Sequence, residues 1–490
     1  MNPSIASPGS SNQRDPDHSP GIERAFTHAF EEADNVRCEV EGEIPSFVRG
    51  TLLMNGPARF GRGDVRYKHW LDGDGMVAAL RFGEGGASYQ SRFVKSSKLA
   101  REEKEGRVVY RAFGTSFSGD ELIRGIALAS PVNVSAYPVA GKLLAFGEQG
   151  LPWALDRATL ETEGEHSFDG QLNAISPFSA HPKFDRVTGE MFNFGISYSA
   201  TAPILNVYRF GADQRLVYRS RIPIGIPSSV HDFSIGPRHL VFHLSPYLLD
   251  MSLLSREGKS VMEALSWEPA RGSRLVVVAR DSGELVASIP AGSSYCLHLI
   301  NAFGEDGRLV VDLLELDRPV YDQYQTIPDL FTDVSEGGAV RFVLDLEGAR
   351  LVSRVDSPYR SAPDFPTIDL NLSTRRADEF WMVGISATGK PGRKFFDEMV
   401  HGDWSAPAKL DVYRAPGSCY FGSEPVHVAD PVKKHPGVVI AHMFDATAMK
   451  SSWLLFDASS VSKGPVARVR VPTLCHLGFH TCFERETVPQ

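Results

Sequence analysis

Short apolar runs separated by turn residues fill most of the chain from about residue 40 onward. Several of these runs are continuously apolar or alternate between apolar and polar positions, as β-strands do: residues 76–82, 191–195, 275–279, 309–314 and 438–444. Glycine-containing breaks lie between them and predict turns, as at residues 185–189. Strands spaced about 10 to 15 residues apart are typical of a sandwich, a barrel or a propeller. At this length and without a linker, an all-β propeller is favoured, although no sharp repeat gives the number of blades.

Two segments interrupt the strand pattern. Residues 120–129 carry two acids before an apolar stretch and predict a short amphipathic helix. Residues 244–254 form an apolar insertion soon after one of the predicted strands. Both segments have two interpretations. They are loops that cover the core, or they form an exposed apolar patch at a tunnel mouth, where Ile123, Ile126, Leu128 and residues 248–254 would contact a membrane.

Composition limits the classes of protein and partner. The 490 residues are 42% hydrophobic and 23% charged, with a net charge of 51 − 60 = −9 and no basic run, which argues against nucleic acid. Residues 1–20 are rich in Pro, Ser, Asn and Asp and predict a disordered tail before a single domain over residues 21–490. Five cysteines without a CxxC pair suggest a reducing compartment, and no apolar run reaches the ~18 residues of a membrane span. We therefore expect a monomeric cytoplasmic protein.

Four histidines lie inside or beside strand-like runs: His181, His231, His298 and His480. A buried histidine needs a partner, and any one of them alone is most simply explained as a structural residue. Together they suggest a shared centre, because neutral imidazole binds iron, zinc, copper and nickel well. The separations of 231 − 181 = 50 and 298 − 231 = 67 residues are each comparable to one propeller blade.

The chain resembles the carotenoid cleavage oxygenases at residues 50–57, Gly-Thr-Leu-Leu-Met-Asn-Gly-Pro, and at residues 69–77. The histidine stretches follow that family's order: Ser-Ala-His181-Pro-Lys, His231-Asp-Phe, His298 before Asn-Ala-Phe, and Gly-Phe-His480. The similarity runs from about residue 38 to the C-terminus. It implies a seven-bladed β-propeller under a dome of helices and loops, with the four histidines holding one non-haem Fe(II). The implied reaction inserts O2 across a conjugated C=C bond of a carotenoid or apocarotenoid and gives two carbonyl products.

The resemblance also implies three carboxylates that accept the free N–H of the second, third and fourth histidines. Glu148 and Glu424 match two of these positions. The third falls in residues 362–366, where Asp364 stands in place of the family's glutamate. Aspartate is one methylene shorter, so we expect its contact either to be direct after a backbone adjustment or to pass through a water.

Cleavage of a polyene needs a dry apolar tunnel and no acid–base pair, so we expect no catalytic carboxylate pair. Aromatic residues near the motifs are candidates for the tunnel wall, with ordinary core packing as the alternative: Phe113, Phe117, Trp153, Phe178, Phe233 and Phe303. The remaining histidines are interpreted as structural or solvated. His476, four residues before His480, competes with it as a ligand, but His480 carries the family pattern.

Other activities stay open. Lignostilbene-cleaving members of the family carry a lysine just before the first glutamate, where this chain has Gly147, which favours an apolar polyene. Isomerisation with ester cleavage occurs in the retinoid isomerase branch, but nothing in the sequence specifically supports it. A propeller without catalysis that binds a ligand or a protein is the alternative from another class, and an iron assay would distinguish it.

Overall fold

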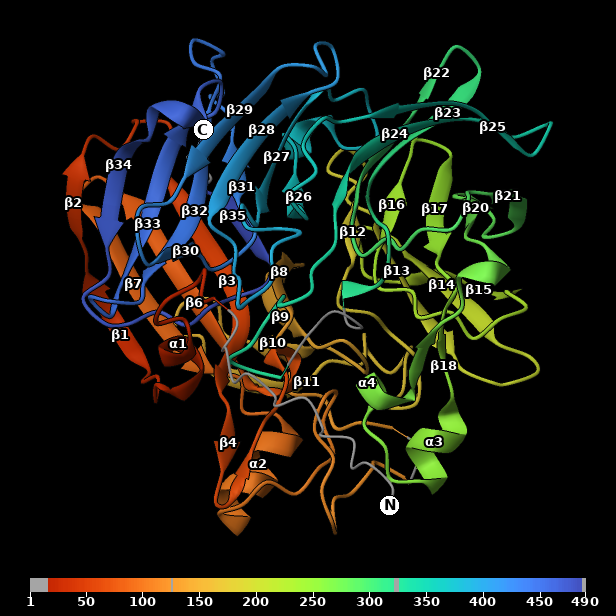
Figure 1. Ribbon diagram of the computed structural model, residues 1–490, viewed down its shortest axis with the longest axis horizontal. Helices are drawn as coiled ribbons and strands as arrows, with labels where there is room; N and C mark the ends of the chain where they lie inside the picture. The colour runs from red at the N-terminus through yellow and green to blue at the C-terminus, as the bar shows by residue number, and fades with distance from the viewer. Residues whose placement is uncertain (1–15, 125–126, 321–325, 487–490) are drawn as a thin grey trace, which may run out of the picture.

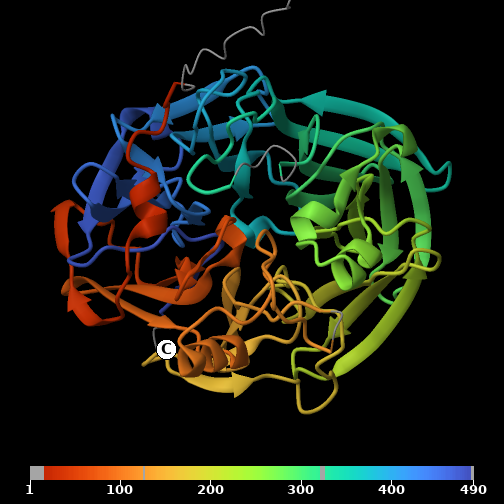
Figure 2. The same cartoon turned by 60° about the horizontal axis from the view of Figure 1, so that its bottom comes forward.

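Seven antiparallel sheets follow one another around a central axis in the computed structural model, which describes residues 16–124, 127–320 and 326–486 (Figures 1 and 2). Each sheet has four to six strands, and Figure 2 shows them in chain order around the ring. The prediction of an all-β, seven-bladed propeller is confirmed. The predicted strands are formed too: residues 191–195 lie in β13 (Met191–Ser197) and residues 309–314 in β23 (Arg308–Leu316).

Five blades are built from strands that are close in the chain. Their strands, blade by blade, are β8 (Ser135–Val139), β9 (Lys142–Phe146), β10 (Trp153–Leu155) and β11 (Thr162–Glu165); β12 (Lys183–Phe184), β13, β14 (Ile204–Phe210) and β15 (Leu216–Pro223); β16 (Phe233–Ile235), β17 (His239–Leu244), β20 (Arg274–Ala279) and β21 (Leu285–Pro290); β22 (Leu299–Glu305), β23, β24 (Gly337–Asp345) and β25 (Arg350–Asp356); and β26 (Asp364–Thr367), β27 (Glu379–Gly384), β28 (Glu398–Asp403) and β29 (Leu410–Arg414).

The other two blades each combine strands from both ends of the described chain. One contains β1 (Ala33–Arg37), β7 (Gly86–Phe93), β6 (Asp74–Gly83), β3 (Gly50–Arg59) and β35 (Thr481–Arg485). The other contains β2 (Glu39–Gly42), β34 (Pro465–Arg470), β33 (Lys450–Asp457), β32 (Val438–Asp445), β31 (Val426–Val428) and β30 (Cys419–Phe421). Strand β35 pairs with β3, and β2 pairs with β34, so the ring is closed by two sets of backbone hydrogen bonds.

The blades bury their inner strands and expose their outer ones. Strand β16, the first of its blade, is buried along its length, whereas β25, the last of the next blade, is almost wholly exposed. Between neighbouring blades the core is aromatic: the Phe233 and Phe242 rings stack with centroids 5.2 Å apart, and Phe194 meets Phe233 edge-on at 5.4 Å. Inner ends of the strands are therefore held in fixed positions around the axis.

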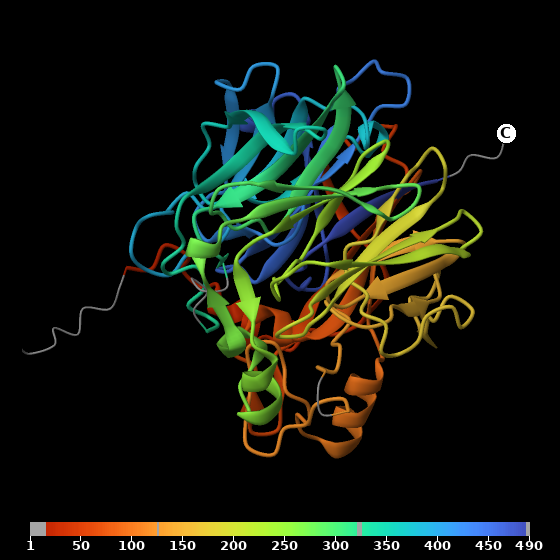
Figure 3. The same cartoon turned by 90° about the vertical axis from the view of Figure 1, so that its right-hand side faces the viewer.

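A dome of short helices and hairpins covers one end of the ring (Figure 3). Its elements are α1 (Glu23–Thr27), η1 (Trp70–Asp72), α2 (Ser97–Glu105), α3 (Met251–Arg256), α4 (Val261–Ala264), the hairpin of β4 (Gly61–Arg62) and β5 (Val65–Arg66), and the hairpin of β18 (Tyr247–Leu249) and β19 (Leu265–Trp267). The short 3₁₀ segments η2 (Pro269–Arg271), η3 (Leu370–Leu372) and η4 (Val461–Lys463) lie in connections elsewhere. Helix α2 is fixed by the buried Lys98, whose Nζ lies 2.7 Å from Asp74 Oδ1 and 3.0 Å from Glu102 Oε2.

The prediction of a helix over residues 120–129 is wrong within its described part. Ile123 and Ala127 instead pair in an isolated antiparallel bridge. The two acids expected in the first helical turn bind arginines of neighbouring segments, Asp120 with Arg111 and Glu121 with Arg101. These ion pairs anchor the segment to neighbouring parts of the dome.

The apolar insertion takes the first of its two expected forms, and the predicted tail is described only from residue 16. Leu248, Leu249 and Leu254 are buried, so residues 244–254 cover the core instead of presenting an apolar surface. At the other end, residues 1–15 of the predicted tail lie outside the described residues. Ser19 is buried and Asp17 pairs with Arg393, so the chain is already packed against the ring there.

Four histidines outside the axial cluster are almost completely buried: His69, His243, His442 and His476. Burial lowers the pKa of His69, His442 and His476 to about 3 and that of His243 to about 4, from the ordinary 6.5. These side chains are therefore neutral in the folded protein at any pH above about 4. Unfolding exposes them to water, where each regains its ordinary affinity for a proton.

Acid should consequently destabilise the fold. A histidine whose folded pKa is depressed binds more protons when unfolded, so its stability contribution is lost as the pH falls below about 6.5. Between the unfolded and the folded pKa, each of the four histidines lowers the free energy of unfolding by at most about 1.4 kcal/mol for each pH unit of acidification. We expect the unfolding free energy from urea titrations to fall steeply between pH 6.5 and pH 4.5, and the slope to be smaller by about one histidine's share in His442→Gln. An unfolding free energy independent of pH over this range would contradict this assignment.

Candidate metal centre

The four predicted histidines converge on the propeller axis. His181 and His231 lie two residues before β12 and β16, and His298 and His480 lie one residue before β22 and β35. Each therefore ends a loop at the start of the inner strand of a different blade. All four are buried, and one nitrogen from each lies within 4.8 Å of the others. The Nε2 atoms of His181 and His231 are 2.9 Å apart.

Carboxylates hold the Nδ1 atoms of three of these rings. Glu148 Oε1 lies 2.8 Å from His231 Nδ1, and Glu424 Oε2 lies 3.2 Å from His480 Nδ1. Asp364 Oδ1 lies 2.5 Å from His298 Nδ1. An ionised carboxylate only accepts hydrogen bonds, so each ring carries its proton on Nδ1 and leaves the Nε2 lone pair facing the axis.

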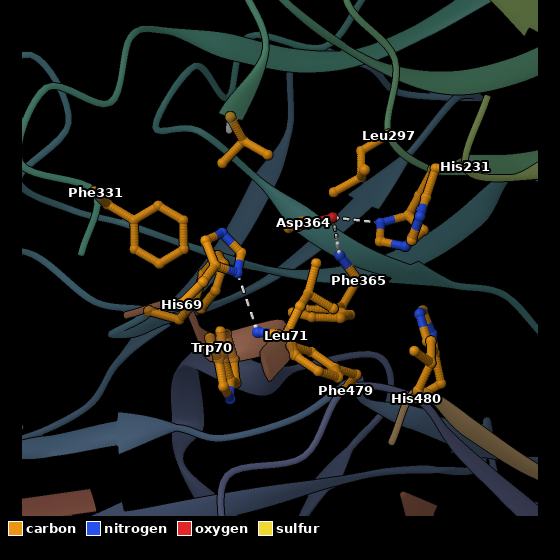
Figure 4. Close-up of a pocket in the computed structure, with 14 residues that line it drawn as sticks. His69, Trp70, Leu71, His231, Leu297, Phe331, Asp364, Phe365, Phe479 and His480 are labelled. Carbon is orange, nitrogen blue, oxygen red and sulfur yellow. Dashed lines mark hydrogen bonds and ion pairs between the residues drawn. The ribbon is translucent and has the colours of Figure 1, made fainter. Parts of the chain in front are cut away.

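Asp364 reaches its histidine directly, despite its shorter side chain. Close to it in the chain, Ala362 and Phe365 take the left-handed conformation, with φ of 42° and 51°. The strand pairing of β26 with β27 shifts register at this point. The Phe365 amide also donates to Asp364 Oδ1 at 2.8 Å, which fixes the carboxylate (Figure 4). Of the two expected arrangements, the structure has the direct contact.

Burial decides the protonation of the cluster. It lowers the pKa of His181 well below its ordinary value, aided by the three neighbouring imidazoles, and it lowers the pKa of His480. For His298 burial also acts to lower the pKa, but the adjacent Asp364 carboxylate outweighs it and raises the pKa overall. His181 and His480 are therefore neutral at physiological pH, as metal ligands must be.

The residues fit a transition-metal ion. His298 Nε2 is buried and has no hydrogen-bond partner among the described residues, which is costly unless a ligand occupies the site. Four imidazole nitrogens form a donor set that suits iron, zinc, copper or nickel, whereas magnesium and calcium prefer oxygen ligands. The carboxylates behind the rings supply the outer hydrogen bonds typical of such sites.

Two cavities border the histidine cluster, and His231 lines both of them. The larger, of about 490 Å³, reaches His231 and Glu148 and is lined by three of the predicted aromatics, Phe113, Trp153 and Phe178. The smaller, of about 50 Å³, touches His298 and His480. Figure 4 shows the mainly apolar walls of this smaller cavity, whose aromatic members sequence reasoning missed: Trp70, Phe331, Phe365, Phe396 and Phe479.

Three of the six predicted aromatics do not line either cavity. Phe233 packs between blades against Phe194, and Phe303 is buried beneath the Arg341 guanidinium, 5.1 Å from its ring centroid. Phe117 packs in the dome with the cluster around Tyr67. Phe233 and Phe303 are core residues, and Phe117 is a half-buried dome residue, which the local sequence does not show.

Two charged residues close to the cluster were also not predicted. Asp232 and Lys183 form an ion pair of 2.7 Å, and each lies within two residues of a clustered histidine. The signal was present in the motifs Ser-Ala-His181-Pro-Lys and His231-Asp-Phe. Their polar residues next to the histidines are buried or half-buried in the structure.

Comparisons with known proteins agree with this geometry. A family model described as retinal pigment epithelial membrane protein matches residues 26–485. The apocarotenoid-15,15'-oxygenase of Synechocystis sp. is 27% identical over 88% of this chain and 90% of its own length. The resveratrol cleavage oxygenase 1 of Aspergillus fumigatus is 28% identical over 92% of each. A solved structure of a Synechocystis apocarotenoid oxygenase variant superimposes with a TM-score of 0.86 at 24% identity, covering 97% of this chain and 100% of that one.

The four histidines should hold one metal ion per chain. We expect His298→Ala to lose most of the bound metal, because the substitution removes the imidazole ring that carries Nε2. The measurement is metal content by mass spectrometry after dialysis against a chelator. His243→Ala, which removes a buried histidine of β17 away from the cluster, should keep its metal. Wild-type metal content and activity in His298→Ala would refute the ligand set.

Asp364 should matter through its charge more than through its shape. Asp364→Asn keeps the fold but loses the ionised acceptor for His298, and we expect metal to be held ~10–100-fold more weakly. Asp364→Glu should retain metal, since it keeps the charge. Chelator competition on the two variants and the wild type measures this. Equal metal affinity and turnover in Asp364→Asn would show that another group orients His298.

Proposed function

The chain belongs to the carotenoid oxygenase family represented by the retinal pigment epithelial membrane protein model, and on that premise we propose that it is a non-haem Fe(II) dioxygenase. Its substrate is a carotenoid or apocarotenoid, and its products are the two carbonyl compounds left after oxidative cleavage of one conjugated C=C bond. The observation that carries this proposal is the buried four-histidine cluster at the meeting point of two cavities.

The chain's own residues would perform three tasks in this reaction. The four histidines would hold Fe(II), which when bound supplies the activation of O2. The three carboxylates keep the Nδ1 protons in place, so that the Nε2 atoms remain available. The aromatic walls exclude water and hold a long apolar substrate beside the metal with one double bond in reach.

The space around Gly147 supports an apolar substrate. A Cβ atom at position 147 would lie 2.0 Å from Ser130 Oγ and 3.2 Å from the backbone of Val132. Ser130 Oγ is itself held by the Val132 amide at 3.2 Å. A lysine here, the residue expected of a lignostilbene-cleaving enzyme, would therefore require Ser130 to change its rotamer and the Val132 backbone to shift by a few tenths of an ångström. The glycine that stands here instead favours an apolar substrate.

Cleavage of a stilbene is the second candidate. It is favoured by the similarity to the resveratrol cleavage oxygenase and by polar side chains in the larger cavity, where Tyr198 and Ser229 interact. A phenol could hydrogen-bond to such groups, whereas a hydrocarbon chain could not. The two candidates differ in the substrate and share the metal centre.

Contact with a membrane surface would bring a bilayer-dissolved substrate to the larger cavity. Ile123 and Ile175 line this cavity and are 38% and 67% exposed, and Leu128 lies beside them. These residues take the place of Leu248 and Leu249 in the predicted patch, because both leucines are buried. Ile126 lies outside the described residues.

Among the described residues, no helix is long and apolar enough to span a bilayer. The five cysteines form no disulfide, which supports a reducing compartment such as the cytoplasm.

Ile123 and Ile175 should therefore control binding to lipid vesicles. We expect the double variant Ile123→Ser/Ile175→Ser to float less with liposomes than the wild type, because less apolar surface enters the lipid. Val187→Ser is the matched control, since Val187 is 82% exposed on the turn before β13 and lines neither cavity beside the histidines. Equal flotation of all three proteins would remove the proposed contact.

Product analysis tests the activity itself. Iron-loaded protein should convert a carotenoid or apocarotenoid into two shorter carbonyl compounds, detected by mass, and should leave a hydroxylated stilbene unchanged. Gly147→Lys should not improve carotenoid cleavage, because its side chain displaces Ser130. Turnover of the stilbene alone would reverse the order of the two candidates. No turnover of any polyene or stilbene, with iron bound, would favour a binding protein.

A further inference from the structure

The buried carboxylate of Asp232 lies close to three of the four clustered histidines, through its own place in the chain or through the residues that it binds. Asp232 follows His231 directly and is 3% exposed. Its Oδ2 accepts the amide hydrogen of Leu299, the residue after His298, at 2.9 Å. Its Oδ1 lies 2.7 Å from Lys183 Nζ, two residues after His181. Asp232 thus links three blades at the points where their histidines emerge.

The same carboxylate lies near His181, the one clustered histidine that forms no hydrogen bond with the three other carboxylates. Asp232 Oδ1 lies 3.6 Å from His181 Nδ1. This separation is too long for a hydrogen bond but short enough for a carboxylate to attract an N–H dipole strongly in a buried site. A negative charge at this place favours the His181 tautomer that carries its proton on Nδ1. Nε2 of His181 is then free, in the same way as on the other three rings.

Lys183 explains how this carboxylate remains charged while buried. An isolated ionised carboxylate in the interior is costly, and a bonded cation offsets that cost. The Lys183 side chain is 28% exposed, so its ammonium keeps contact with water while it binds Asp232. The Asp232 end of the ion pair is held in place, because the Leu299 amide donates to the second oxygen of the carboxylate.

We propose that Asp232 and Lys183 act as one positioning unit for His181, equivalent in role to the carboxylates behind the other three histidines. This inference rests on the proposed function only in requiring that the four histidines bind a metal. Asp232 itself lines neither of the two cavities beside the histidines. It acts by fixing the orientation and the tautomer of His181. It also anchors the backbone amide of Leu299, the residue that follows His298.

The test measures metal binding and stability separately. Co(II) is titrated into chelator-treated full-length protein against a competing chelator, and its visible absorption reports the ligand geometry. We expect Asp232→Asn to bind Co(II) about tenfold or more weakly, with a changed spectrum. The thermal midpoint of the metal-free protein should change little, because the asparagine oxygen still accepts from Leu299.

Asp312→Asn is the matched control. Asp312 is another buried aspartate, held by the Arg341 guanidinium at 2.7 and 2.8 Å on β23 and β24. Its loss should lower the thermal midpoint without changing Co(II) affinity or spectrum. If Asp232→Asn behaves in this way instead, Asp232 is a purely structural residue and the proposal is overturned.

Lys183 provides an independent variant that the fold should tolerate, since its side chain is partly exposed. Lys183→Gln should also weaken Co(II) binding, and the double variant Lys183→Gln/Asp232→Asn should be no weaker than Asp232→Asn alone, as expected for two groups acting as one. If the losses of Co(II) affinity in the two single variants add up in the double variant, the proposal that the two residues act as one unit is overturned. Failure of the wild type to bind Co(II) would instead reject the metal centre, and with it the proposed function.

Discussion

Each imidazole at the axis must keep one nitrogen protonated and bonded while it presents the other to a common point. This constraint joins parts of the chain that are far apart, because each carboxylate comes from a different blade than its histidine. Glu148 follows β9 yet serves the histidine before β16, and Asp364 opens β26 yet serves the histidine before β22. The centre therefore depends on the packing between blades, and the aromatic layers that fix those blades also fix the ligands.

The strand pattern was sufficient to predict the strands and to favour a propeller, while the motifs of the family resemblance supplied the seven blades and the four histidines and three carboxylates near the axis. The sequence was not sufficient for features decided by distant contacts. The acids of residues 120–129 suit a helix start but are held by Arg101 and Arg111. Phe178 and Phe233 occur in similar apolar stretches, yet only Phe178 reaches a cavity, since the facing blade encloses Phe233.

Asp364 illustrates the same limit at the level of the backbone. The motif placed a carboxylate behind His298, but its reach could not be read from side-chain length alone. Ala362 and Phe365, close to it in the chain, take left-handed conformations, and its carboxylate lies 2.5 Å from His298 Nδ1. Such conformations are unfavourable for non-glycine residues, and the structure maintains them only because the surrounding strands determine the path of the chain.

The closure of the ring by β35 has a consequence for how the protein is made. His480 stands immediately before β35 and is synthesised after the other three histidines and after all three carboxylates. Its position at the axis exists only once β35 pairs with β3, near the beginning of the described chain. A chain in which β35 has not yet paired with β3 can thus bring at most three of the four rings to the axis. The four-histidine cluster is therefore complete only after β35 has joined the sheet of β3, so closure of the ring and assembly of the cluster are one event.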